Sequence, residues 1–415
     1  DSVWNELNEH HFDTNFNSLN WNEVREKYRP KAAAARSNAQ LRVVIQEMLD
    51  LLHVSHLNIV PGEILEDIRG SSTREDSDPN DIEAAPEDSS GTIGLNFRFL
   101  EDQAIVTSLD PDGSAFKSGV RTGWIIRQIG QSSPEKIFKK IPKNLGDQKR
   151  NFLAWRAVSH RLNGRPGSTV NLELVDADNQ KHEIELTRHL APGQAVQLGN
   201  LPTLYANLTS SYLPEKSARI GYIRFNIWML PTAIAFNNAM DTHRKDDGLI
   251  IDLRGNIGGL VGMLIGSSGH FFKKPGYLGT MIMRDNQLKL IINPRLVDSS
   301  GKLVEPFARP VAILVDEITA SASEVFAGGM QDLGRARIFG RTSSGQALPA
   351  IMEDLPNGDA LYHPIADFVA PSGTRFEGRG VVPDQVVPLN RNALLQGRDP
   401  VVEAATAWIM KESEK

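Results

Sequence analysis

Ser321 stands in a run of residue types that suits nucleophilic chemistry, Asp316-Glu317-Ile318-Thr319-Ala320-Ser321-Ala322-Ser323-Glu324. We expect this run to join a buried strand, 311–315, to a helix. A serine at such a junction is exposed at the carboxyl edge of a sheet, above the free N–H groups of the helix. Those groups favour a developing oxyanion, the main electrostatic need of acyl transfer. Ser321 with Glu324 also fits a capping box, and the local pattern alone favours that structural role.

A glycine-rich run follows another apolar strand: Asp252-Leu253-Arg254-Gly255-Asn256-Ile257-Gly258-Gly259. Glycines there let backbone N–H groups approach a substrate oxygen closely. Phosphate loops and plain tight turns have a similar sequence, but the Gly-Lys-Ser/Thr ending of a nucleotide-binding loop is missing. The Gly-x-Ser-x-Gly elbow of ordinary α/β-hydrolases is missing as well.

Composition excludes several other kinds of chemistry. The 415 residues include no cysteine, which removes disulfides, thiolate metal sites, Fe–S clusters and a cysteine nucleophile. With 45 basic and 51 acidic residues the net charge is −6, which argues against a general nucleic-acid binder. No apolar run reaches the roughly 18 residues that span a bilayer. We expect no cofactor and no metal, because His53 and His56 lack an accompanying carboxylate motif.

The candidate segments need a scaffold, and the pattern predicts a multidomain α/β protein. Strand 249–253 and strand 311–315 each lead through a turn into an apolar helix, which is typical of an α/β core. Ser37 with Gln40 forms a capping box before an amphipathic helix, and the β-branched segment 54–60 is predicted to be a strand. The predicted parts are a helical region 1–65, an acidic linker 66–90, a β-rich domain 91–188, a linker 189–215, an α/β core 216–398 and a terminal helix 399–415.

The β-rich part resembles a PDZ domain of the bacterial protease type. The matching pieces are Gly94-Leu95-Asn96-Phe97, SAFKSGVRTGWIIRQIG (114–130) and LNGRPGSTVNLELVD (162–176), with a long insert around 131–150. The resemblance implies capture of a polypeptide C-terminus by strand addition. Its carboxylate loop is expected at Thr92, Ile93, Gly94 and Leu95, with Leu95 and Phe97 lining an apolar pocket. The alternative is that these residues only close the core of the domain.

The whole chain resembles the C-terminal processing, or tail-specific, protease family. The resemblance rests on GLIIDLRGNIGG (248–259), PVAILVDEITASASEVFAGGMQDLGRARIFG (310–340), FEGRGVVPDQVV (376–387), VWNELNEHHFD (3–13) and MLDLLHVSH (48–56), together with the PDZ-like part. It implies crotonase-like ββα units in the core and a serine endopeptidase of unfolded or C-terminally presented polypeptides, with Ser321 as the nucleophile. Family members are usually exported, so we expect a periplasmic or extracellular protein; the chain begins at Asp1 and a signal peptide is not part of it.

The family divides by its general base. In the tail-specific branch a lysine follows the nucleophile, and here Gln346, which cannot take a proton, stands at that position. The branch that includes the tricorn core uses serine, histidine, a second serine and glutamate. Resemblance to that branch implies that His56 is the base and that Ser55 and Glu377 orient it. Because Ser55 and His56 are adjacent, a bulge or strand end is needed to bring both side chains into one site.

The oxyanion hole is expected to use the N–H of Ala322 and one from the glycine loop, where Gly258 is favoured and Gly259 is the alternative. One such donor is typically worth about 10²–10³ in rate. The rival interpretations are a catalytically silent binding protein on a protease fold and a PDZ-led scaffold. The expected partners are polypeptide substrates, bound by their C-termini, without nucleic acid or an integral membrane span; the oligomeric state is left open.

Overall fold

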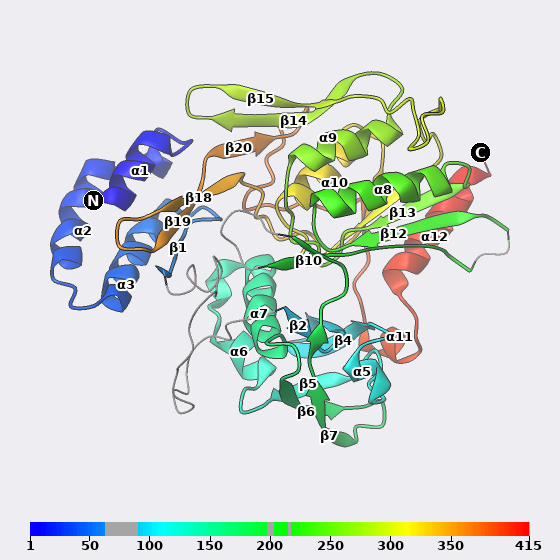
Figure 1. Cartoon of the computed structure of the whole chain (residues 1–415), viewed down its shortest axis with the longest axis horizontal. Helices are drawn as coiled ribbons and strands as arrows, with labels where there is room; N and C mark the ends of the chain where they lie inside the picture. Colours follow the sequence, from blue (N-terminus) through cyan, green and yellow to red (C-terminus); the bar gives the residue numbers. More distant parts are fainter. Residues whose placement is uncertain (63–89, 197–202, 215–216, 415) are drawn as a thin grey trace.

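The structure is a computed structural model that describes residues 1–62, 90–196, 203–214 and 217–414 (Figure 1). In the view of Figure 1 an N-terminal helical unit lies at the left, a β-rich unit at the bottom and an α/β core at the upper right. The predicted acidic linker, 66–90, lies outside the described residues except for Ser90. No helix of the described part is long and apolar enough to cross a membrane.

The N-terminal unit packs three helices around an aromatic cluster. The rings of Trp4 and Trp21 stack with centroids 6.3 Å apart, and Trp4 Nε1 donates to Trp21 O. Ser37 Oγ accepts from Gln40 N, as the predicted N-cap requires. The helices and the strand that follows them are α1 (Ser2–His10), α2 (Trp21–Ala33), α3 (Asn38–Leu49) and β1 (Asn58–Val60).

The predicted strand 54–60 was wrong in its first half, because only β1 is a strand. The backbone bends at Ser55 and His56 instead, and His56 has a φ of +56°. β1 pairs with β19 (Ala360–Pro364) of the core, which fixes the end of the N-terminal unit to it. The bend is the strand end that two adjacent site residues require.

The β-rich unit is an antiparallel sheet of order β3-β4-β5-β6-β7 with helices packed on it. Leu95, Phe97 and Phe138 belong to its core, and the predicted insert 131–150 forms α6 and the start of α7. Its elements are β2 (Gly91–Thr92), β3 (Leu95–Leu100), β4 (Gln103–Leu109), α5 (Ser114–Lys117), β5 (Ile125–Ile129), α6 (Pro134–Lys140), α7 (Asp147–Leu162), β6 (Thr169–Val175), β7 (Lys181–Thr187) and β8 (His189–Leu190).

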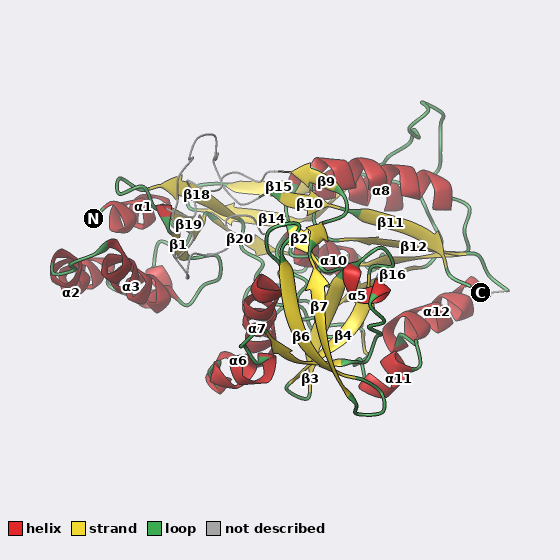
Figure 2. Ribbon diagram, turned by 60° about the horizontal axis from the view of Figure 1, so that its bottom comes forward, coloured by secondary structure: helices red, strands yellow, loops and turns green. Residues whose placement is uncertain are grey.

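The core contains a six-stranded sheet of order β11-β12-β13-β16-β17-β21, parallel except for the edge strand β11. Alternate side chains face opposite layers: Ile251 and Ile313 pack in the cluster with α8, α9 and α10, whereas Leu314 packs with α12. Figure 2 shows α8 and α12 on opposite sides of this sheet. These elements are β11 (Leu208–Tyr212), β12 (Ile220–Phe225), α8 (Leu230–His243), β13 (Gly248–Asp252), α9 (Gly262–Ser268), β16 (Val311–Val315), α10 (Ala322–Asp332), β17 (Arg337–Gly340), β21 (Gln385–Val386), α11 (Arg391–Leu395) and α12 (Pro400–Ser413).

The segment predicted as the linker 189–215 differs from that expectation, because its described residues include short strands. β8 pairs with β2, β9 (Gln194–Val196) pairs with β10 (Leu204–Ala206), and β11 is part of the core sheet. The polar sequence of 208–212 suits an edge strand that is half exposed, so composition alone was misleading there. The remaining core strands are β14 (Gly276–Met283), β15 (Gln287–Ile292), β18 (Ala350–Asp354) and β20 (Ala366–Val369).

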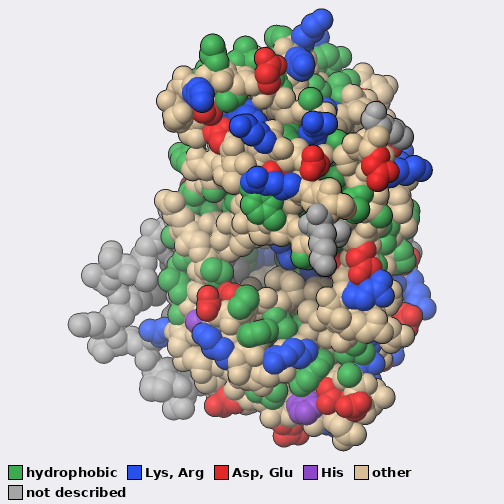
Figure 3. Space-filling model, turned by 90° about the vertical axis from the view of Figure 1, so that its right-hand side faces the viewer, with side chains coloured by type: hydrophobic (Ala, Val, Ile, Leu, Met, Phe, Trp, Pro, Cys, Tyr) green, Lys and Arg blue, Asp and Glu red, His purple; other side chains and the backbone are tan. Residues whose placement is uncertain are grey.

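The core and the β-rich unit meet across several contacts. Arg391 of α11 donates to Gly123 O, and Thr122 Oγ1 donates to Leu394 O. Figure 3 shows the right-hand side of Figure 1, where a hollow lies at mid-height between the core above and the β-rich unit below. Basic and acidic side chains are interspersed over this face.

Candidate active site

Ser321 lies where the parallel strand β16 gives way to helix α10. Its backbone has φ +54° and ψ −123°, a region that residues with a Cβ rarely occupy. Such a conformation costs about 1–3 kcal/mol and persists only where neighbouring contacts impose it. Here Ser321 N donates to Gln346 O at 2.8 Å and to Glu324 Oε2 at 3.1 Å. The side chain is therefore held at the turn, at the carboxyl edge of the sheet.

The glycine loop lies directly against Ser321, because the carboxyl ends of β13 and β16 share one edge. A Cβ on Gly258, whose φ is +104°, would lie 2.6 Å from Ser321 Cβ. The Gly258 N–H donates to Asn256 Oδ1 at 3.0 Å and is thus occupied. Within the described residues, the N–H groups of Gly259 and Ala322 have no hydrogen-bond acceptor. These two are the free donors beside the serine.

His56, Ser55 and Glu377 form one hydrogen-bonded group. Ser55 Oγ lies 2.7 Å from His56 Nδ1 and donates to Glu377 Oε2 at 3.0 Å. Since the hydroxyl has one proton, which goes to the carboxylate, the Nδ1 of His56 must donate to Ser55 Oγ. The Nε2 of His56 then carries the lone pair, which is the tautomer that a general base needs. The left-handed bend at His56 lets both side chains reach this group.

Two neighbouring backbone groups connect the His56–Ser55–Glu377 group to Ser321. Gln346 O accepts from Ser321 N, and Ala347 N donates to Glu377 Oε2 at 3.0 Å. Segment 346–347 thus contacts the nucleophile with one residue and the carboxylate with the next. The structure brings Ser321 and Glu377 close to segment 346–347 although they lie 56 positions apart in the sequence, and Glu377 holds Ser55 beside it.

Burial sets the proton affinities in this region. It lowers the pKa of His56 to about 4, so the imidazole is neutral at pH 7. Burial also raises the pKa of Glu377, against the hydrogen bonds from Ser55 and Ala347 that lower it. Tyr362 of β19 meets the His56 ring edge-on, with centroids 5.6 Å apart, and covers it from one side.

Glu324 is buried beneath Ser321 and organises the loop 343–346. Its carboxyl group accepts from Ser343 Oγ at 2.5 Å, Gly345 N at 2.8 Å and Gln346 N at 2.9 Å, in addition to Ser321 N. Burial raises the pKa of Glu324 to about 7, although the Ser343 and Gly345 hydrogen bonds lower it. The glutamate of the predicted capping box therefore also fixes the loop that contains Gln346.

A buried ion pair joins the β-rich unit to both active-site loops. Arg98 Nε of β3 lies 2.7 Å from Asp316 Oδ2, and both side chains are 6% exposed. Asp316 Oδ1 in turn accepts from Gly255 N and Thr319 N. No sequence motif predicted this pair, because its members lie 218 positions apart in the sequence.

The predicted carboxylate loop lies at the start of β3. Gly94 N donates to Thr92 Oγ1 at 3.1 Å, and Gly94 has a φ of +73°. Ile93, Leu95 and Phe97 are at most 8% exposed and belong to the core of the β-rich unit. In this structure the apolar side chains of the loop fill the domain interior.

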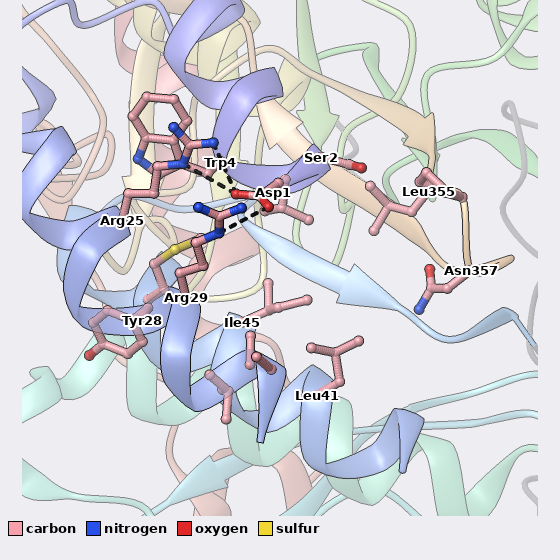
Figure 4. Close-up of a pocket in the computed structure, with 16 residues that line it drawn as sticks. Asp1, Ser2, Trp4, Arg25, Tyr28, Arg29, Leu41, Ile45, Leu355 and Asn357 are labelled. Carbon is pink, nitrogen blue, oxygen red and sulfur yellow. Dashed lines mark hydrogen bonds and ion pairs between the residues drawn. The ribbon is translucent and has the colours of Figure 1, made fainter. Parts of the chain in front are cut away.

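An apolar cavity of about 470 Å³ lies elsewhere, in the N-terminal unit (Figure 4). Trp4, Ile45 and Leu355 line it, and at one side Asp1 pairs with Arg25 and Arg29. No residue of the Ser321 region lines this cavity.

Comparisons with known proteins identify what the chain is similar to. Residues 219–387 match the model of peptidase family S41, and residues 1–50 match that of the tricorn protease C1 domain. The core of the chain, residues 219–387, is therefore a peptidase family S41 region. The matched region contains Ser321, the glycine loop and Glu377, and this S41 protein is a serine peptidase that acts on polypeptides.

Relatives and solved structures extend the likeness to nearly the whole S41 chain. A chloroplastic C-terminal processing peptidase of Tetradesmus obliquus is 25% identical over 398 residues, covering 92% of this chain and 75% of its own. The structure of a photosystem II D1 C-terminal processing protease, 22% identical, gives a TM-score of 0.59 and covers 98% of this chain and 95% of its own. That of the tricorn protease, 18% identical, gives 0.50 over all of this chain and 36% of its own. The fold is thus the mixed α/β multidomain fold of these proteases.

Three residues that contact the candidate site escaped the sequence analysis. Tyr362 and Arg98 come from strands distant from the motifs, and no local pattern marks them. Ala347 contributes only its N–H, which every residue except proline has. Sequence signals identify side-chain chemistry, whereas these contributions depend on position alone.

Proposed function

We propose that this S41 peptidase is an endopeptidase that works through a Ser321 acyl-enzyme with His56 as general base. The observation that carries the proposal is the hydrogen-bonded group of His56, Ser55 and Glu377, connected to Ser321 through segment 346–347. Serine needs a base to take its proton, and a neutral imidazole with a free Nε2 is such a base.

In the proposed reaction Ser321 Oγ attacks the peptide carbonyl carbon while its proton passes to His56 Nε2. The imidazolium that forms is stabilised through Ser55 by the Glu377 carboxylate. His56 then gives the proton to the leaving amine as the C–N bond breaks. Water attacks the acyl-enzyme with the same base, which releases the acid and restores Ser321.

The free N–H groups of Ala322 and Gly259 are the proposed oxyanion donors. Gly258 was the first choice on sequence grounds, but its N–H already donates to Asn256 Oδ1. Its proposed role is steric, because a side chain there would collide with Ser321. Each donor is worth roughly 10²–10³ in rate.

Replacement of Ser321 tests the nucleophile. Ser321→Ala is expected to lose casein hydrolysis and stoichiometric labelling by a fluorophosphonate, while circular dichroism stays unchanged. Ser323→Ala is the matched control, since Ser323 is buried and its Oγ accepts from Trp228 Nε1 at 2.9 Å. That control costs about 1–3 kcal/mol of stability through an unpaired indole N–H but retains the activity of the folded fraction. Casein hydrolysis at the wild-type rate by Ser321→Ala would contradict the assignment.

The proposed substrates are unfolded or C-terminally presented chains, which the PDZ-like unit selects by their ends. Chain-end capture by strand addition holds the carboxylate in backbone amides. Amidation of the C-terminus should then slow cleavage of a long substrate, whereas short internal peptides are cut at nearly unchanged rates. Equal rates for the free acid and the amide of one long substrate would remove chain-end selection and leave the endopeptidase proposal intact. Export is part of the same proposal, supported by the chloroplastic relative.

A further inference from the structure

A serine–histidine–aspartate group lies in the core and shares no residue with the site above. Ser210 Oγ of β11 lies 2.8 Å from His243 Nε2, at the end of α8. His243 Nδ1 lies 2.7 Å from Asp246 Oδ2. Ser210 is exposed, whereas His243 is 1% and Asp246 0% exposed. An exposed serine hydroxyl thus contacts a buried imidazole, which in turn contacts a buried carboxylate.

The hydrogen-bond inventory fixes the direction of this group. A carboxylate only accepts, so Asp246 takes the proton of His243 Nδ1. The Nε2 is then an acceptor, and the Ser210 hydroxyl must donate to it. Arg219 Nε lies 2.9 Å from Asp246 Oδ1 and forms an ion pair with it, although Oδ1 accepts no hydrogen bond within the described residues. This is the same order of groups that turns a serine into a nucleophile.

The surrounding fold is shaped to hold the pair. A Cβ on Gly221 of β12 would lie 2.6 Å from His243 Nδ1 and 3.1 Å from Asp246 Oδ2, so only a glycine leaves room for them. The ring of Tyr212 meets the His243 ring edge-on, with centroids 4.9 Å apart. The imidazole is therefore fixed by contacts on several sides rather than free to rotate.

The backbone of β11 supplies one further group. Leu213 N donates to Ile220 O at one end of the strand, and Asn207 O accepts from Asn226 N at the other. In an antiparallel pair the bonded residues alternate, so the odd-numbered residues of β11 bond to β12 and Ser210 presents its N–H to the free edge of the sheet. β11 forms that edge beside α8 in Figure 2. A carbonyl oxygen beside Ser210 would meet a single backbone donor.

We propose that Ser210 is a nucleophilic serine that takes the acyl group of small activated esters, independently of Ser321. Ser210 Oγ attacks the ester carbonyl carbon, its proton passes to His243 Nε2, and the bond to the aryloxide leaving group breaks as the Ser210 ester forms. One oxyanion donor gives less stabilisation than the pair at Ser321. Amides, with their poorer leaving group, are outside its reach, and aryl esters are its substrates.

The test uses the full chain with Ser321→Ala as the background, treated with p-nitrophenyl acetate. We expect a burst of p-nitrophenolate of one equivalent and an acetyl group that peptide mass spectrometry maps to Ser210. Adding Ser210→Ala removes the burst, and because Ser210 is exposed this variant keeps its fold. Ser211→Ala is the matched control, since Ser211 is an exposed serine on the opposite face of the same strand.

Asp246→Asn tests whether the Asp246 carboxylate supports His243 as the base. It should slow the acylation of Ser210 roughly 10²-fold while the far-ultraviolet circular dichroism spectrum stays unchanged. A burst that survives Ser210→Ala, or acetyl groups spread over lysines without an excess at Ser210, overturns the proposal. An unchanged acylation rate in folded Asp246→Asn overturns the proposed role of Asp246. None of these outcomes depends on whether Ser321 is the peptidase nucleophile, since that serine is absent from the tested protein.

Discussion

The Ser321 region and the Ser210 group contain similar side chains in different backbone settings. Ser321 stands on a strained turn at a helix start, with the free N–H groups of Ala322 and Gly259 beside it. Ser210 stands within an extended edge strand, where its own N–H faces the solvent edge. Ser210 contacts its histidine directly, whereas Ser321 is connected to the His56–Ser55–Glu377 group through segment 346–347. The number of donors aimed at a developing oxyanion separates a site suited to peptides from one suited to activated esters.

Substitution of His56 in one group and of Asp246 in the other gives the largest expected contrast. His56→Ala should lower casein hydrolysis by about 10³-fold or more, because Ser321 then has no proton acceptor. Asp246→Asn should leave casein hydrolysis unchanged, since it acts on the other serine. Both rates are divided by the concentration of folded protein, which circular dichroism measures. A loss of casein hydrolysis in folded Asp246→Asn would show that the two regions are coupled.

Gly258→Ala should disturb the oxyanion donors at Ser321 without affecting Ser210. The added Cβ, placed 2.6 Å from Ser321 Cβ at a φ of +104°, must displace the serine or the loop, and we expect a fall in kcat/KM of roughly 10²-fold. Gly262→Ala is the control, because a Cβ there meets no atom within 4 Å. Acylation of Ser210 should be unaffected by both changes. Full peptidase activity in Gly258→Ala would argue against contact between the glycine loop and the nucleophile.

The pH profile should give the smallest but most specific difference. Because burial lowers the pKa of His56 to about 4, the imidazole stays neutral as the pH falls below its ordinary 6.5. The acid limb of kcat/KM for peptide hydrolysis is thus expected near pH 4, below the ordinary histidine range. A limb near pH 7 that vanishes in Glu324→Gln would instead report Glu324, whose pKa burial raises to about 7. A profile governed only by a group above pH 9 would contradict a histidine base.

The amino-acid sequence by itself determined the chemistry that the molecule carries and the elements next to it. Strand 311–315 and the helix after Ser321 are present as predicted, because an apolar β-branched run and a helix cap act locally. The same holds for the last helix, where Asp399 accepts from Val401 N. The resemblance to the family rested on these local motifs, and the comparisons bore it out.

Tertiary structure decided what brings those motifs into contact. The bend at His56 is held by Glu377, which accepts from Ser55 N and lies 322 positions further along the chain. The occupied N–H of Gly258 and the strand 208–212 depend instead on nearer partners, Asn256 and β12. The Arg98–Asp316 pair and the Ser210–His243 contact have no local signal, since each depends on how units pack. A sequence pattern records the preferences of neighbouring residues, whereas hydrogen bonds between distant segments form only when burial makes an unpaired polar group costly.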